Sequence, residues 1–236
     1  MAIIIRIDVD RPYGRRPVLR HVLSRLSSEA YLPRIEAFGY LRELKVMLEM
    51  LNEEQAQSYV FFRRCTLPSA AVMRLLGEGR HEPGLHLENS RSFVTFAREK
   101  QLLERHTGKK AKAVSKHGSG GAKFGYHHYA PYEPEKYVEW AQESSMSVFF
   151  GNLEDPTLRP FSSNGCFWTY PGAFWLEPHW RDTDRFPVEW LVQEAKKSDI
   201  VLLVHPENVL ESPRLTEDFR RIISTVETKV LDSICA

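Results

Sequence analysis

The chain alternates short apolar runs with longer amphipathic segments. β-Branched and aromatic residues between turn residues predict buried strands at 3–9, 58–62 and 199–204, with weaker extended runs at 82–87, 112–115 and 147–150. Apolar residues that recur every three or four positions predict helices at 35–51, 68–76, 90–106, 134–144, 187–197 and 213–230. The stretch 11–34 has the pattern of a basic loop. Strands that alternate with helices predict βαβ units and a mainly parallel α/β sheet, either open or closed into a barrel.

Composition narrows the class of protein. The chain has 236 residues, of which 42% are hydrophobic and 11% aromatic, and this suffices for a large buried core. No linker rich in Gly, Ser or Pro divides it, so a single domain over residues 1–236 is predicted. The 32 basic and 31 acidic residues leave a net charge of +1, which argues against a nucleic-acid partner.

The apolar runs also bear on localisation. The N-terminal run is short and meets charge at Arg6 and Asp8, unlike a signal peptide. No apolar stretch reaches the 18 residues that a membrane span requires. The sequence therefore predicts a cytoplasmic protein without a membrane span.

Polar side chains gather where the predicted strands end. Asp8 and Asp10 close the first strand, and with a period of two residues their carboxylates point to the same side. His86, His117 and His205 each lie at the end of a later extended run. Sites in parallel α/β folds collect at the carboxyl ends of strands, so these five side chains are predicted to converge at one mouth of the fold.

Each of these residues also has a structural explanation when it is taken alone. An aspartate before Arg11-Pro12 suits a turn, and a lone histidine such as His81 is more often a hydrogen-bonded core residue than a ligand. Together, however, one carboxylate and two imidazoles form an ordinary first shell for a divalent metal. A second carboxylate would then be left as general base and another histidine as general acid.

The sequence resembles the polysaccharide deacetylase (NodB-homology) superfamily, which is related to carbohydrate esterase family 4. Three segments carry the resemblance to its first, second and final motifs: Ile7-Asp8-Val9-Asp10, Arg80-His81-Glu82-Pro83-Gly84-Leu85-His86 and Leu202-Leu203-Val204-His205. The resemblance implies a distorted, incomplete (β/α)7 barrel with one divalent metal, and carboxylate and imidazole ligands favour zinc. It also implies Asp8 as base and His205 as general acid. The ligands that it implies are Asp10 and His86.

Two departures from the family pattern shape the expected site. Ser90 stands four residues after His86, where the family has a second ligand histidine. Ser115-Lys116-His117-Gly118 occupies the place of the family's Arg-x-Pro-Tyr motif, and His117 is predicted to supply the missing third ligand. Substrate contacts are expected from Glu88, Asn89, Gly118 and Trp180.

The leading hypothesis is a metal-dependent carbohydrate deacetylase that hydrolyses a linear amide and so removes an acetyl or other acyl group from an N-acylated sugar or glycan precursor. Nucleotide- and lipid-linked sugars are among the candidate substrates. The alternative is a non-catalytic member of the same fold that binds a glycan or a partner protein, and Ser90 favours it. A third class, barrel hydrolases that act on phosphate esters or cyclic amides, would normally carry His-x-His on the first strand, and Asp8-Val9-Asp10 argues against it.

Overall fold

The computed structural model describes residues 1–118, 121, 124–163, 165–179 and 186–231. The strands are β1 (Ile3–Val9), β2 (Ser58–Phe62), β3 (Glu82–Leu87), β4 (Ala113–Lys116), β5 (Val148–Leu153), β6 (Phe161–Ser163), β7 (Phe167–Gly172), β8 (Phe174–Trp175) and β9 (Ile200–Val204). The helices are α1 (Val18–Ala30), α2 (Arg42–Glu53), α3 (Ala70–Glu78), α4 (Phe93–Thr107), α5 (Pro134–Glu143), α7 (Val188–Glu194), α8 (Pro206–Leu210) and α9 (Pro213–Thr225), with short 3-10 turns η1 (Glu36–Phe38) and η2 (Arg64–Thr66).

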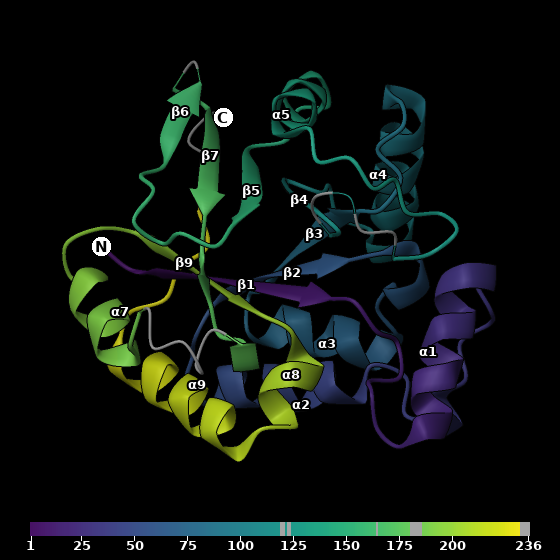
Figure 1. Ribbon diagram of the computed structural model, residues 1–236, viewed down its shortest axis with the longest axis horizontal. Coiled ribbons are helices and arrows are strands. Elements are labelled where there is room, and N and C mark those ends of the chain that lie inside the picture. Colours follow the sequence, from purple (N-terminus) through teal and green to yellow (C-terminus); the bar gives the residue numbers. More distant parts are fainter. Residues whose placement is uncertain (119–120, 122–123, 164, 180–185, 232–236) are drawn as a thin grey trace.

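The strands form one curled, mostly parallel sheet in the order β6-β7-β5-β4-β3-β2-β1-β9-β8. β1 lies between β2 and β9 and is parallel to both, whereas β6 pairs antiparallel with β7. Helices α2, α3, α8 and α9 lie together on one side of the sheet, and α4 and α5 lie on another (Figure 1). The predicted α/β fold is thus confirmed as a distorted, incomplete barrel. It has seven longer parallel strands, to which the chain adds the antiparallel β6 and the two-residue parallel strand β8.

β7 and β8 are consecutive in the chain but lie near opposite ends of this sheet, β7 next to the edge strand β6 and β8 as the other edge. β7 is parallel to β5, and after Ala173 the chain continues as β8, which is parallel to β9. The Ala173 N–H donates to the Leu153 carbonyl, and the Leu176 N–H donates to the Leu203 carbonyl. The sheet therefore curls toward closure through the continuity of the segment that contains β7 and β8.

Alternation along β1 divides its side chains between two environments. Ile3, Ile5 and Ile7 belong to the main apolar core that the helices cover. Ile4 belongs to a second apolar cluster, which strand residues build on the inner face of the curl. Arg6 and Asp8 follow Ile4 at the same two-residue period and are both buried, so the inner face becomes polar toward the end of β1.

The helix predicted at 213–230 was too long, since α9 ends at Thr225 and Val226 is extended, and two other assignments, one loop and one helix, were also wrong. Residues 11–34 contain helix α1, whose Val18, Leu19 and Val22 stay exposed and so do not form the pattern of a core-facing helix. The helix expected at 35–51 begins only at Arg42, because Gly39 takes a positive φ of 77° and interrupts it. In the described part of the chain, no helix is both long and apolar enough to cross a bilayer.

The segment that contains β7 and β8 leads to the first prediction. Gly172 ends β7, where a Cβ would lie 2.0 Å from the backbone oxygen of Asp155. Gly172→Ala should therefore lower the free energy of unfolding by about 1–3 kcal/mol, because backbone must shift to relieve the overlap. Gly77 in α3 is the matched control: a Cβ there meets no atom within 4 Å, and Gly77→Ala should stabilise by about 0.5–1 kcal/mol. Urea denaturation measures both, and wild-type stability of Gly172→Ala would contradict the close approach.

Candidate active site

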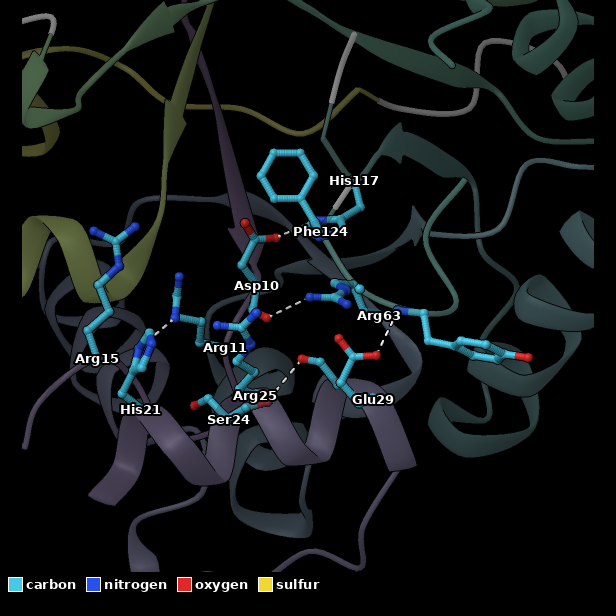
Figure 2. Close-up of a pocket in the computed structure, with 13 residues that line it drawn as sticks. Asp10, Arg11, Arg15, His21, Ser24, Arg25, Glu29, Arg63, His117 and Phe124 are labelled. Atoms are coloured by element: carbon cyan, nitrogen blue, oxygen red, sulfur yellow. Dashed lines mark hydrogen bonds and ion pairs between the residues drawn. The ribbon is translucent and has the colours of Figure 1, made fainter. Parts of the chain in front are cut away.

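The carboxyl ends of β1, β3 and β4 bring three potential metal ligands together. Asp10 Oδ1 lies 2.9 Å from His117 Nδ1 (Figure 2) and 3.1 Å from His86 Nε2, and the two ring nitrogens are 3.3 Å apart. Two ligand atoms that each lie about 2.0–2.1 Å from a tetrahedral zinc are roughly 3.3–3.4 Å from each other. The Asp10–His86–His117 triangle thus has nearly the size of a tetrahedral first shell, and its donors fit a divalent metal.

Neighbouring groups keep the two imidazoles in a form suited to metal binding. His86 Nδ1 is hydrogen-bonded to Ser115 Oγ at 2.7 Å, which leaves Nε2 directed at Asp10. Burial, followed by the positive charge of Arg63, lowers the pKa of His117 to about 4. His117 is therefore neutral at pH 7, and neutral imidazole is the form that binds metals.

Asp8 is held in a buried ion pair with Arg6, two residues earlier on the same strand face. Arg6 donates from Nε to Asp8 Oδ1 at 2.9 Å and from Nη2 to Oδ2 at 2.6 Å. Burial by itself raises the pKa of Asp8, but Arg6 and then His86 outweigh it, so the pKa falls below its usual value. Asp8 Oδ2 lies 3.7 Å from His86 Nε2, which places an ionised carboxylate beside the triangle.

His205 meets the triangle from the β9 side. Its Nε2 lies 3.5 Å from Asp10 Oδ2, and its Nδ1 is hydrogen-bonded to Glu177 Oε1 at 2.6 Å. Asn208 Nδ2 donates to the other oxygen of Glu177, which fixes that buried carboxylate. Burial lowers the pKa of His205, but Glu177 raises it, with smaller contributions from Asp10 and Asp8, to about 10. A protonated imidazole whose Nε2–H lies beside the triangle is suited to donate a proton.

These groups share one cavity of about 480 Å³. The five residues that were predicted to converge all line it: Asp8, Asp10, His86, His117 and His205. Gly118, an expected substrate contact, lines it as well, and Trp175 lies beside His205 with 6.4 Å between ring centroids. The structure therefore brings the predicted catalytic and ligand residues to one mouth.

Two other expected substrate contacts need correction. Glu88 is 1% exposed and its carboxylate forms an ion pair with the buried Arg63, so its role is structural. Asn89 N–H donates to Glu99, and neither Glu88 nor Asn89 lines either of the two cavities beside Asp10 and His117. The remaining expected contact, Trp180, lies outside the described residues.

Ser90, at the position of the family's second histidine, has a packing role. Its side chain is fully buried, and Oγ lies 3.3 Å from the hydroxyl of Tyr137 on α5. His117 supplies the third donor of the triangle in its place. His81 is likewise structural, since its ring nitrogens are hydrogen-bonded to Ser58 and Asn52.

The sequence analysis missed Arg6 and Glu177. Arg6 had a signal, because a charged residue in an apolar strand, two positions before Asp8, needs a buried counter-charge. Glu177 had none, since it lies 28 residues before its partner His205 in a stretch without regular periodicity.

The buried ion pair yields a stability prediction. Arg6→Met should lower the free energy of unfolding by about 3–5 kcal/mol, because Asp8 would remain as an unpaired buried charge. The double variant Arg6→Met/Asp8→Leu should regain most of that loss. Arg74→Met, which removes an exposed ion pair with Glu78, is the control and should change stability by less than about 1 kcal/mol. Equal instability of the single and double variants, measured by chemical denaturation, would show that the charge is not the cause.

No protein-family model matches the sequence, and a sequence comparison with curated proteins gives no match. Solved structures do match. A protein from Mycobacterium smegmatis assigned as a polysaccharide deacetylase has a TM-score of 0.59 and 15% identity, covering 94% of this chain and 82% of its own. The peptidoglycan deacetylase PdaC from Bacillus subtilis has a TM-score of 0.45 and 12% identity, covering 96% of this chain and 85% of its own.

A carbohydrate esterase family 4 pseudoenzyme from Bacillus anthracis matches with a TM-score of 0.49 and 12% identity over 94% of this chain. The match covers 59% of the pseudoenzyme, so this chain spans about three fifths of its length. At these identities the likeness is one of fold. The resemblance expected from the motifs is confirmed at that level: the chain has the fold of the polysaccharide deacetylases.

Proposed function

We propose that this protein is a metal-dependent hydrolase that removes an acetyl or other acyl group from the nitrogen of an N-acylated sugar or glycan precursor. The observation that carries the proposal is the Asp10–His86–His117 triangle, with Asp8 and His205 each within 4 Å of one of its members. The fold shared with the Mycobacterium smegmatis protein, assigned as a polysaccharide deacetylase, supports a glycan or small-molecule substrate.

The triangle would hold the metal through one carboxylate and two imidazoles, a donor set that favours zinc. A bound divalent metal would polarise the amide carbonyl and make a nucleophilic water more acidic. Ser115 would keep His86 in the orientation that this role requires, through its bond to Nδ1.

Asp8 and His205 would divide the two proton transfers of amide hydrolysis. Asp8 is ionised through the neutral range, so it can take a proton from the attacking water, and Arg6 fixes both of its oxygens. His205 is protonated and can pass its Nε2 proton to the nitrogen as the C–N bond breaks. Addition of one water across the amide yields a free amine and a carboxylic acid.

Metal uptake is the first test of this proposal. Metal-free protein should bind one equivalent of zinc in calorimetric titration, and His117→Ala should lose stoichiometric binding. Ser115→Ala removes the partner of His86 Nδ1 and should weaken affinity by about 10–100-fold. His128→Gln is the control, because His128 Nε2 is bonded to the His117 carbonyl. Full zinc content in His117→Ala would exclude His117 as a ligand.

Turnover is the second test, measured as acetate released from N-acetylated sugars by the zinc-loaded protein. His205→Ala should lower kcat by about 10²–10⁴-fold and leave zinc content unchanged. Glu177→Gln removes the carboxylate that raises the pKa of His205 to about 10. His205 can act as an acid only below its pKa. The alkaline limb of the plot of kcat against pH should therefore move to lower pH in Glu177→Gln.

Glu154→Gln is the matched control for Glu177→Gln, because Glu154 lines the same cavity but lies beside His179. An alkaline limb that stays at the same pH in Glu177→Gln would show that Glu177 does not determine the pKa of the general acid. Tight binding of a sugar without release of acetate would favour the non-catalytic alternative.

A further inference from the structure

A second cavity, of about 630 Å³, opens between α1 and the Asp10–His117 side of the site (Figure 2). It meets the cavity described above at Asp10, Arg15, His117 and Phe124, which line both. Its size is that of a small-molecule site. A ligand that occupies both cavities would pass directly over the Asp10–His86–His117 triangle.

Basic side chains dominate the lining of this second cavity: Arg11, Arg15, His21, Arg25 and Arg63. Figure 2 shows Arg25 and His21 rising from α1 and Arg63 reaching in from the sheet side. Arg63 is neutralised by Glu88, and Arg11 lies 3.6 Å from Glu207. Arg15 and Arg25 have no carboxylate partner within the described ranges. Arg15 and Arg25, both exposed, thus present to the cavity guanidinium charge that no carboxylate of the described residues contacts.

The acidic residues of the lining are already engaged. Asp10 belongs to the triangle, and Glu29 accepts the Tyr126 N–H at 2.7 Å. The guanidiniums of Arg11, Arg15 and Arg25 line the same cavity, and like charges there repel one another. An anion in the cavity would relieve this repulsion.

We infer that this cavity binds a phosphate group of the substrate, so that the N-acylated sugar is a sugar phosphate or a phosphate-linked sugar. The inference rests on the proposed function for the amide end. Phosphate carries up to two charges and offers several acceptor oxygens, so Arg15 and Arg25 can share one group together with Arg11. A carboxylate has a single charge and two oxygens, and it matches this set of donors less well.

The substrate comparison uses zinc-loaded wild-type protein. Values of kcat/KM for N-acetylglucosamine 1-phosphate, the 6-phosphate and UDP-N-acetylglucosamine are set against neutral N-acetylglucosamine. At least one phosphorylated substrate should exceed the neutral sugar by about tenfold or more. A preference for the diphosphate would point to an activated, carrier-linked sugar, and a preference for a monophosphate to a free sugar phosphate. Equal values for neutral and phosphorylated sugars would overturn the inference while the hydrolase proposal stands.

The variant comparison does not depend on turnover. Arg15→Ala and Arg25→Ala should each weaken the binding of inorganic pyrophosphate, measured by calorimetry on zinc-loaded protein, by about 10–100-fold, and Arg25→Lys should recover part of the loss. Arg16→Ala is the matched control: Arg16 has the same charge, is next to Arg15 and is also exposed, but it lines neither cavity and lies 3.9 Å from Glu211.

The two proposals can fail separately. If no sugar releases acetate but pyrophosphate binding still requires Arg15 and Arg25, the phosphate site stands and the hydrolase proposal fails. If pyrophosphate binds Arg25→Ala as tightly as wild type, the phosphate site is wrong, whatever the activity. If a carboxylated N-acetyl sugar is hydrolysed faster than every phosphorylated one, the phosphate assignment is also wrong.

Discussion

The buried ion pair between Arg6 and Asp8 is the constraint on which the site depends. A charged residue within the apolar strand β1 would be costly to bury alone, so Arg6 and Asp8 need each other. Arg6 also donates to the Gly151 carbonyl and to Asn152 Oδ1, and these bonds tie the centre of the sheet to β5 across the interior of the curl. The same contacts hold Asp8 ionised and oriented at the mouth.

Parallel pairing on both sides of β1 then positions the other groups. Ile7 pairs with Val204, so His205 emerges from β9 beside Asp8. On the other side, His86 pairs with Ser115, and the His117 N–H donates to the Leu87 carbonyl. Backbone ladders therefore fix the relative positions of His86, His117 and His205.

Charge in this protein is organised locally rather than overall. The net charge of +1 gives no hint of the arginines that gather between α1 and the triangle. Four buried carboxylates near the site each have a partner: Arg6 for Asp8, Arg63 for Glu88, His205 for Glu177 and Arg11 for Glu207. Arg15 and Arg25 line the cavity beside Asp10 and His117, where the proposed phosphate group would compensate their charge.

The sequence by itself determined the parallel α/β architecture and the five residues at the mouth. Both follow from local rules, namely the spacing of apolar residues and the convergence of parallel strands at their carboxyl ends. It did not determine helix α1, because its exposed apolar residues follow no core pattern, or the packing role of Ser90. Only the tertiary structure paired Glu177 with His205, turned Glu88 toward Arg63 and gathered Arg15 and Arg25 at one cavity. Such pairings join segments that are distant in sequence, and they depend on how side chains pack, which residue spacing does not record.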